Sequence, residues 1–237
     1  MLANLGDFLF RYRNLLFPLC LPLAFLPGAN LFDHALVAAA LGFATAALGE
    51  IVRASTIGLQ YIVRGGRDRR VYAQDLVTGG LYSHTRNPMY VGNMLILAGL
   101  AIASNSWTTV AVAIPLYALV CAAIVAAEER YLRSRFGADF EAYCRDVPRW
   151  LPRLSGIRST LADHSFNWRR VVIKEYGTPL GWIWAWGVLV VWNLGRSDGG
   201  VATNRPALVV VVAVMAAILA FWVFARITKK SRRWGSV

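Results

Sequence analysis

Residues 107 to 127 read WTTVAVAIPLYALVCAAIVAA and carry no charged side chain. Because a bilayer core takes roughly 20 apolar residues per helix, this stretch predicts a membrane-spanning helix. Four similar runs, and a weaker one around 15 to 27 that prolines interrupt, predict an all-α integral membrane protein of about six transmembrane helices. The four runs are residues 206–225, 89–104, 179–194 and 35–49, the last able to continue past Glu50 and Arg53 to Val63.

The charges agree with this layout. Only 16% of the residues are charged, against about 25% in a soluble domain, yet the formal net charge is +12. Lysines and arginines gather at the N-terminus, between the second and third runs, between the fourth and fifth, and after the last. Under the positive-inside rule, this predicts an inner or endoplasmic reticulum membrane protein with both termini cytoplasmic. Membrane lipids, and not nucleic acid, are therefore the expected partners of the basic residues; the oligomeric state stays open.

The common motifs of soluble chemistry are missing from the sequence. It contains no GxGxxG, P-loop, CxxC or HExxH pattern, so neither a Rossmann domain nor a bound metal is predicted. The three cysteines do not form a disulfide framework, since two fall within apolar runs. Chemistry is therefore expected in the two large cytoplasmic segments and the helix ends that face them.

The first of these segments ends at Asn87-Pro88. Asn is a good N-cap and Pro suits the first helical position, so a helix is predicted to start there. Its free N–H groups would suit an anionic or carboxylate-bearing ligand at the cytoplasmic face. The alternative is an ordinary connection that ends in a well-capped helix.

The second segment begins with Glu128-Glu129. Two carboxylates at a helix C-terminus would oppose its dipole, so we expect the helix to continue to Phe136 and to stop at Gly137. Glu129 can pair with Arg133 at i,i+4. Glu128 has no such partner, and an ionisable residue at membrane depth is a functional candidate.

Glu50 and Arg53 are spaced i,i+3 near the cytoplasmic end of the second run. They form either a satisfied ion pair or part of a substrate pocket. Both alternatives stay open, and Glu50 and Arg53 are candidate substrate-binding residues.

Three ordered motifs resemble the isoprenylcysteine carboxyl methyltransferase and phospholipid methyltransferase superfamily. They are LVTGGLYSHTRNPMYVG (76–92), EERYLRSRFG (128–137) and YCRDVPRWLP (143–152), and the resemblance covers roughly residues 50 to 152. It implies an enzyme that transfers a methyl group in line from S-adenosylmethionine to a lipid or lipidated acceptor at the cytoplasmic membrane face. It also divides the chain into residues 1–63 with helices 1 and 2, a methyltransferase core at 64–152, and a connection with two extra helices at 153–237.

Carried over residue by residue, the resemblance implies a cofactor site. The N-terminus of the helix that starts at Asn87-Pro88 would bind the cofactor's carboxylate, and Glu128 would bind its ammonium group. Arg86 would brace the loop or pair with a carboxylate. Glu128 or His84 would deprotonate an amine acceptor. For His84 the alternative is a purely structural role, which is the more common one for a single histidine. The implied catalytic residues are Glu128, Arg86 and His84, and the implied cofactor contacts are Gln74, Asp75, Leu76, Val77, Tyr82, Asn87, Pro88, Met89, Tyr90 and Glu128.

One departure bears on the acceptor. The eukaryotic enzymes that methylate prenylated cysteine place an Arg one turn before the glutamate matching Glu128, where this chain has Ile124. A carboxylate acceptor would lose its expected charge partner. Prenylated cysteine is therefore disfavoured as the acceptor.

Two other functions fit parts of the pattern. Sterol-type NADPH-dependent membrane reductases share an RxPxYxG and YxxxVPxxxxP framework, but the Glu128-Glu129 pair and the short chain favour the methyltransferase. A non-catalytic membrane scaffold would need only the six-span layout. Use of S-adenosylmethionine separates the three hypotheses.

Overall fold

A computed structural model describes residues 2–60, 73–196 and 204–230 of the 237-residue chain. In these residues the regular elements are helical, and the only β-type pairing is an isolated bridge between Asn30 and Ser106. The all-α prediction is confirmed. The elements are α1 (Leu2–Cys20), η1 (Leu21–Phe25), α2 (Ala35–Leu59), η3 (Gly80–Ser83), α3 (Pro88–Ala103), α4 (Trp107–Asp146), α5 (Ile157–Asp163), α6 (Trp168–Glu175), α7 (Gly177–Arg196) and α9 (Arg205–Lys230).

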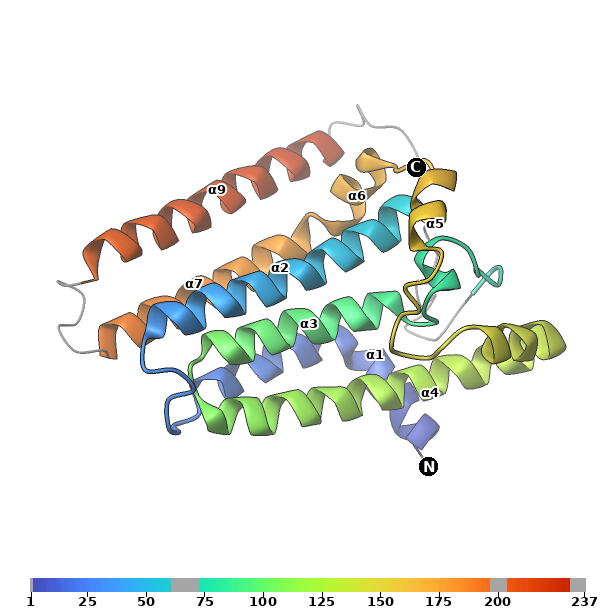
Figure 1. Ribbon diagram of the computed structural model, residues 1–237, viewed down its shortest axis with the longest axis horizontal. Coiled ribbons are helices and arrows are strands. Elements are labelled where there is room, and N and C mark those ends of the chain that lie inside the picture. The colour runs from blue at the N-terminus through green and yellow to red at the C-terminus, as the bar shows by residue number, and fades with distance from the viewer. Residues whose placement is uncertain (1, 61–72, 197–203, 231–237) are drawn as a thin grey trace.

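The long helices lie side by side in an elongated bundle, and the short helices α5 and α6 gather at one end of it (Figure 1). The start of α1 and the end of α9 lie toward this same end. Within the described ranges, three helices are long and apolar enough to cross a membrane, which supports a membrane protein: Ala35–Leu59, Trp107–Asp146 and Arg205–Ile227. The count of six spans and the cytoplasmic orientation stay predictions.

Two predicted helix boundaries differ from the structure. The first helix begins at Leu2 and ends at Cys20, earlier than the expected run of 15 to 27. A 3₁₀ helix follows it and contains Pro22, whose missing N–H cannot continue an α-helical ladder. The second helix ends at Leu59, short of Val63, which lies outside the described residues.

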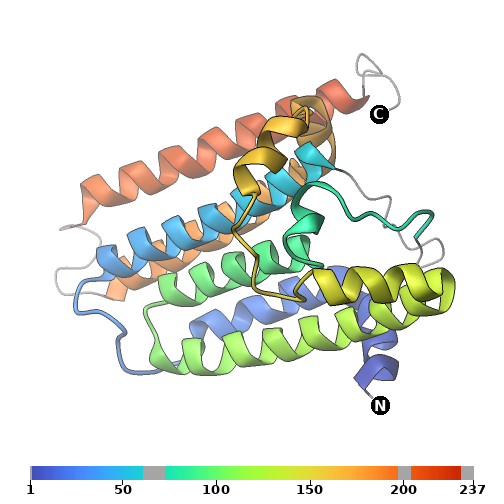
Figure 2. The same cartoon turned by 45° about the vertical axis from the view of Figure 1, so that its right-hand side comes forward.

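The long helix α4 is broken at Gly137, where φ is 48° and ψ is −120°. Glycine tolerates this left-handed φ because it has no Cβ. The chain then turns back, and residues 138–146 run beside the preceding turns of α4 (Figure 2). Phe140 and Tyr143 pack with Leu132 in one buried cluster, so the predicted stop at Gly137 is confirmed.

Helices α2 and α3 pack backbone to backbone along a seam of four glycines, Gly42 and Gly49 on α2 and Gly92 and Gly99 on α3. A Cβ atom on Gly49 would lie 2.5 Å from the Gly92 carbonyl oxygen, and one on Gly99 would lie 2.5 Å from that of Gly42. Small residues allow this close approach between membrane helices. The seam fixes α3 against α2, and both helices carry site residues.

We expect Gly99→Ala to destabilise the protein by about 1 to 3 kcal/mol, because the added methyl group meets backbone atoms that cannot move aside. Thermal unfolding in detergent measures this as a lower melting temperature. Gly181→Ala is the matched control: Gly181 lies in α7 with nothing within 4 Å of its added Cβ. Alanine is the better helix former, so this variant should melt at the same temperature or slightly higher. Equal losses in both variants would contradict the close seam.

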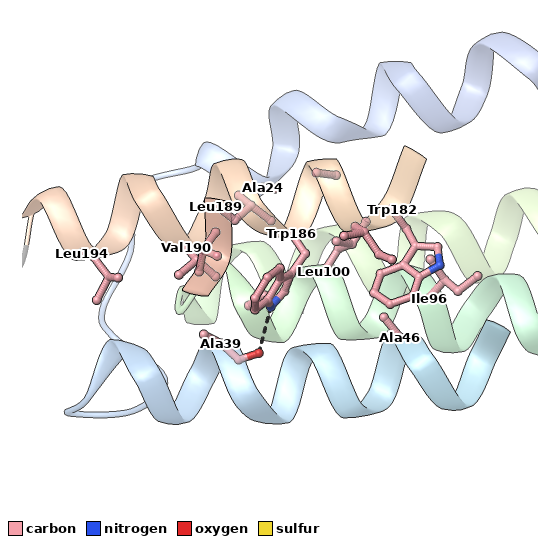
Figure 3. Close-up of a cluster of buried hydrophobic side chains, with 14 residues drawn as sticks. Ala24, Ala39, Ala46, Ile96, Leu100, Trp182, Trp186, Leu189, Val190 and Leu194 are labelled. Atoms are coloured by element: carbon pink, nitrogen blue, oxygen red, sulfur yellow. Dashed lines mark hydrogen bonds between the residues drawn. The ribbon is translucent and has the colours of Figure 1, made fainter. Parts of the chain in front are cut away.

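Helix α7 packs against α2 and α3 through tryptophan side chains (Figure 3). The Trp186 indole donates to the Ala39 carbonyl oxygen at 2.9 Å, and the Trp182 indole donates to Glu50 at 3.0 Å. Leu189 and Ile96 lie in the same buried cluster. The C-terminal part of the chain therefore shares a core with the helices that the sequence motifs occupy.

Candidate functional site

Two segments far apart in the sequence, residues 84–87 and 148–153, are hydrogen-bonded to each other beside the start of α3. We call them the paired loops. The Arg86 N–H donates to the Pro148 carbonyl at 2.9 Å, and the Arg153 N–H donates to the His84 carbonyl at 3.0 Å. The Asn87 amide donates to the Arg149 carbonyl at 3.0 Å. The first and third sequence motifs thus build one rigid structure.

His84 lies buried within the paired loops and uses both ring nitrogens. Nδ1 is 2.6 Å from the Arg153 carbonyl oxygen, and Nε2 is 2.9 Å from the Thr160 hydroxyl of α5. With both nitrogens engaged, the ring ties the loops to α5. This geometry favours the structural alternative over proton transfer.

We therefore expect His84→Asn to lower the melting temperature while leaving the pH profile of any methyl transfer unchanged, because a side chain that only braces the loops does not set a catalytic pKa. Activity assays across pH, beside thermal unfolding, separate the two effects. His164→Asn is the control, since the one hydrogen bond of His164 to the described residues goes to the Thr160 carbonyl of the preceding turn. Loss of one limb of the pH profile in His84→Asn alone would restore His84 as a catalytic residue.

Glu129 joins the second motif to the paired loops. Arg149 contacts both of its carboxylate oxygens at 3.1 Å, and Arg86 Nη1 lies 3.6 Å from Oε1. The predicted Glu129–Arg133 pair is wrong, because Arg133 instead meets Glu141 at 3.5 Å. Arg86 was expected either to brace the loop or to pair with a carboxylate. Its side chain pairs with Glu129, and its backbone N–H also joins the paired loops.

The neighbouring Glu128 has a different surrounding. Its side chain comes from α4 and is buried, at 5% exposure. The Tyr90 hydroxyl of α3 donates to its Oε1 at 2.9 Å. Tyr90 packs beside Tyr117, Cys121 and Trp150 in a second apolar cluster. A carboxylate is thus held between two helices by a phenol.

Tyr90 lies in the first turn of α3. The helix begins at Pro88 as predicted, but the Asn87 side chain makes no cap hydrogen bond and turns to the paired loops instead. The first N–H groups of α3 therefore have no side-chain cap from Asn87. The Tyr90 side chain thus brings the buried Glu128 carboxylate to the first turn of α3, whose positive end lies nearby. This pairing suits a group carrying both charges.

The other predicted cofactor residues lie in differing surroundings. Tyr82 is buried, and its carbonyl accepts from the Tyr143 hydroxyl at 2.7 Å. Leu76 packs against the cluster that contains Tyr143. Gln74 and Asp75 are exposed, Val77 and Met89 are half-buried, and Pro88 is buried. The structure therefore joins Tyr90 with Glu128 directly and links Tyr82 and Leu76 through Tyr143.

Arg53 is buried where α2, α3 and the α6–α7 region meet. Its guanidinium contacts Glu175 at 2.5 and 2.6 Å and also donates to Asn93 and, at 3.4 Å, to Thr178. Gly92 leaves room for the arginine, since a Cβ there would lie 2.5 Å from Arg53 Cγ. Burial raises the pKa of the Glu175 carboxyl, and the guanidinium opposes this shift.

Glu50 does not take Arg53 as its hydrogen-bond partner; it accepts from Trp182 instead. The partner Glu175 lies 122 residues beyond Arg53, so no local spacing could have found it. In the part of the chain that the structure describes, no group of three or more His, Cys, Asp or Glu residues could hold a metal ion.

These observations define a helical membrane protein with a buried polar site at one end of its bundle. The chain belongs to the phospholipid methyltransferase family, whose sequence profile matches residues 35–139. The matched region comprises α2, α3 and most of α4, including Tyr90 and Glu128. The resemblance inferred from the motifs is therefore confirmed.

Two curated relatives are similar to this chain. The cobalt-zinc-cadmium resistance protein CzcN of Cupriavidus metallidurans is 36% identical over 118 residues, which are 49% of this chain and 51% of that protein. The nickel-cobalt-cadmium resistance protein NccN of Alcaligenes xylosoxydans xylosoxydans is 30% identical over 173 residues, which are 72% and 75% of the two chains. The chain thus spans about half of the first relative and three quarters of the second. No solved structure matches this chain significantly.

Proposed function

We propose that the protein is an S-adenosylmethionine-dependent methyltransferase that acts on a lipid or lipidated acceptor at the cytoplasmic membrane face. The observation that carries this proposal is the buried Glu128 carboxylate, held by Tyr90 beside the start of α3. The amino-acid part of the cofactor has one carboxylate and one ammonium group. The α3 N-terminus suits the first and Glu128 the second.

The pair of a positive helix end and a buried carboxylate fits the amino-acid part of this cofactor. When bound, the cofactor supplies a methyl group activated by its sulfonium for direct attack by an acceptor nucleophile. The chain's part is to align the two reactants and to exclude water. The hydrogen bond from Tyr90 fixes the Glu128 carboxylate in one orientation, and the paired loops hold the start of α3 in place.

We propose that Glu50, and not Arg53, contacts the methyl acceptor. Arg53 already contacts Glu175, Asn93 and Thr178, so it offers no unpaired charge to an anionic acceptor. Glu50 accepts only from Trp182 among the described residues. At the position where prenylcysteine enzymes carry Arg, Ile124 is buried at 3% exposure, which also disfavours a carboxylate acceptor.

The names of the two relatives suggest a biological setting. We propose that methylation of a membrane acceptor is the contribution that this chain makes to metal resistance. Expression of the wild-type chain in a metal-sensitive bacterial strain should raise the tolerated concentration of cobalt or cadmium, whereas Glu128→Gln at equal abundance should not. Equal protection by both forms would favour the non-catalytic scaffold.

The direct test is methyl transfer from labelled S-adenosylmethionine into a total lipid extract by the purified full chain. We expect label in an extractable lipid with the wild type and with Glu141→Gln, whose exposed carboxylate pairs with Arg133. Glu128→Gln should lose most of the label. No labelled product from folded protein would overturn a lipid acceptor, and NADPH oxidation with a sterol would favour the reductase alternative.

A further inference from the structure

A polar cavity lies at the far end of the bundle, where η1, the start of α2, and the ends of α3 and α7 meet. Its volume is about 330 Å³, and its lining includes Asn30, Asp33, Asn105, Trp192, Asn193 and Arg196. Ser104 also lines it, 14 residues along the chain from Tyr90. At 1.5 Å per helical residue the cavity is roughly 20 Å from the Tyr90–Glu128 pair. It is therefore a separate site.

Hydrogen-bonded polar residues hold the lining of this cavity in place. Asn105 has a left-handed φ of 53°, and its side chain bonds both the N–H and the carbonyl of Phe32, at 2.9 and 3.1 Å. The Ser106 hydroxyl donates to the Leu26 carbonyl and caps α4 by accepting from the Thr109 N–H. Asn193 donates to the Ala103 carbonyl at 2.8 Å. These bonds hold the cavity in one shape.

Two opposite charges line this cavity without a polar partner among the described residues. Neither Asp33 nor Arg196 has a hydrogen bond or an ion pair within the described residues, although both line the same space. The Arg196 guanidinium lies over the Trp192 ring, 5.4 Å from its centre, and the edge of Phe25 packs on that ring. The aromatic pair supports the guanidinium from one side and leaves its N–H donors available.

We propose that this cavity binds a zwitterionic phosphate–ammonium group, with the phosphate on Arg196 and the ammonium on Asp33. Arginine matches phosphate geometry through paired N–H donors, and a carboxylate complements an ammonium group. A simple anion or cation would neutralise only one of the two side chains. The ligand is either the head group of a membrane phospholipid or a free zwitterion of the same chemistry. This site does not depend on the proposed methyl transfer.

The test uses the full chain purified in detergent and three probes in calorimetric titrations. They are dihexanoyl phosphatidylethanolamine, dihexanoyl phosphatidylglycerol, which lacks the ammonium, and phosphoethanolamine, which lacks the acyl chains. The ethanolamine lipid should bind at least tenfold more tightly than the glycerol lipid. Asp33→Asn and Arg196→Gln should each weaken its binding at least tenfold. Arg205→Gln, an exposed arginine outside the cavity lining, should leave it unchanged.

The probes also separate the two sources. If the ethanolamine lipid binds and phosphoethanolamine does not, the natural ligand is a bilayer lipid. If both bind with equal affinity, the ligand is a free zwitterion. Either result supports the phosphate–ammonium site. Equal affinity for the two lipids, or no effect of either substitution in protein with wild-type melting temperature, would overturn it. Asp33 and Arg196 are exposed, so neither variant should impair folding.

Discussion

Replacing Glu128 by Gln is expected to weaken S-adenosylhomocysteine binding by about 10- to 150-fold. A hydrogen bond to a charged group contributes about 1.5 to 3 kcal/mol, and the amide keeps the shape of the side chain while removing its charge. The amide oxygen can still accept from the Tyr90 hydroxyl, so the local packing should persist. Isothermal titration calorimetry on the purified full chain measures the change directly.

Two further variants sharpen this result. Tyr90→Phe removes the donor that fixes Glu128 and should cost about 0.5 to 1.5 kcal/mol of binding, a smaller loss than the charge itself. Glu141→Gln alters an exposed glutamate in the part of α4 that turns back after Gly137 and should bind like the wild type. Unchanged affinity in Glu128→Gln, or an equal loss in Glu141→Gln, would remove Glu128 from the cofactor site.

Breaking the buried Arg53–Glu175 pair from one side should destabilise the fold by about 3 to 5 kcal/mol, because a charge is left buried without its partner. Arg53 and Glu175 are only 11% and 4% exposed, so water cannot compensate. Arg53→Met and Glu175→Leu should each show this loss in denaturant unfolding. The double variant should recover most of it, since two apolar side chains then fill the same space.

The exposed pair between Asp7 and Arg130 is the matched control. Its side chains are 53% and 48% exposed, so Asp7→Asn should change the free energy of unfolding by less than about 1 kcal/mol. Strictly additive losses in the Arg53 and Glu175 double-mutant cycle would show that the two side chains are not coupled. Such additivity would contradict the contact between α2 and α6.

Local sequence signals predicted most of the helices. The uncharged runs placed both ends of α3, α7 and α9 within a few residues and also the start of α4, and Asn87-Pro88 and Gly137 marked a start and a break. Each of these signals depends on the residues next to it: apolar length, a proline, a glycine. The start of α1 at Leu2 was not predicted, because polar and charged residues interrupt the apolar run in its first turns.

The partners of charged residues were harder to predict. The i,i+4 rule assigned Arg133 to Glu129, but Arg149 takes that place after the chain turns back at Gly137. Glu175 reaches Arg53 from beyond the family motifs. Spacing along one helix cannot show which residues another segment brings close, and these contacts decide the pairing.

The candidate site was predictable in part. Glu128 stood out because the residue at i+4, Leu132, cannot form an ion pair with it, and Tyr90 came from the resemblance alone. The hydrogen bond between them was found only in the structure. The structural use of His84 depends on Arg153 and Thr160, 69 and 76 residues away. No local pattern distinguishes such a brace from a catalytic base.

The proposed methyltransferase activity requires that the protein bind the methionine-derived cofactor. Calorimetric titration of the wild-type full chain with S-adenosylhomocysteine tests it most directly. We predict saturable binding at about one site per chain, together with a rise in melting temperature, because a ligand that binds only the folded state stabilises it. Folded protein that shows neither saturable heat nor a shift in melting temperature would contradict the proposed methyltransferase.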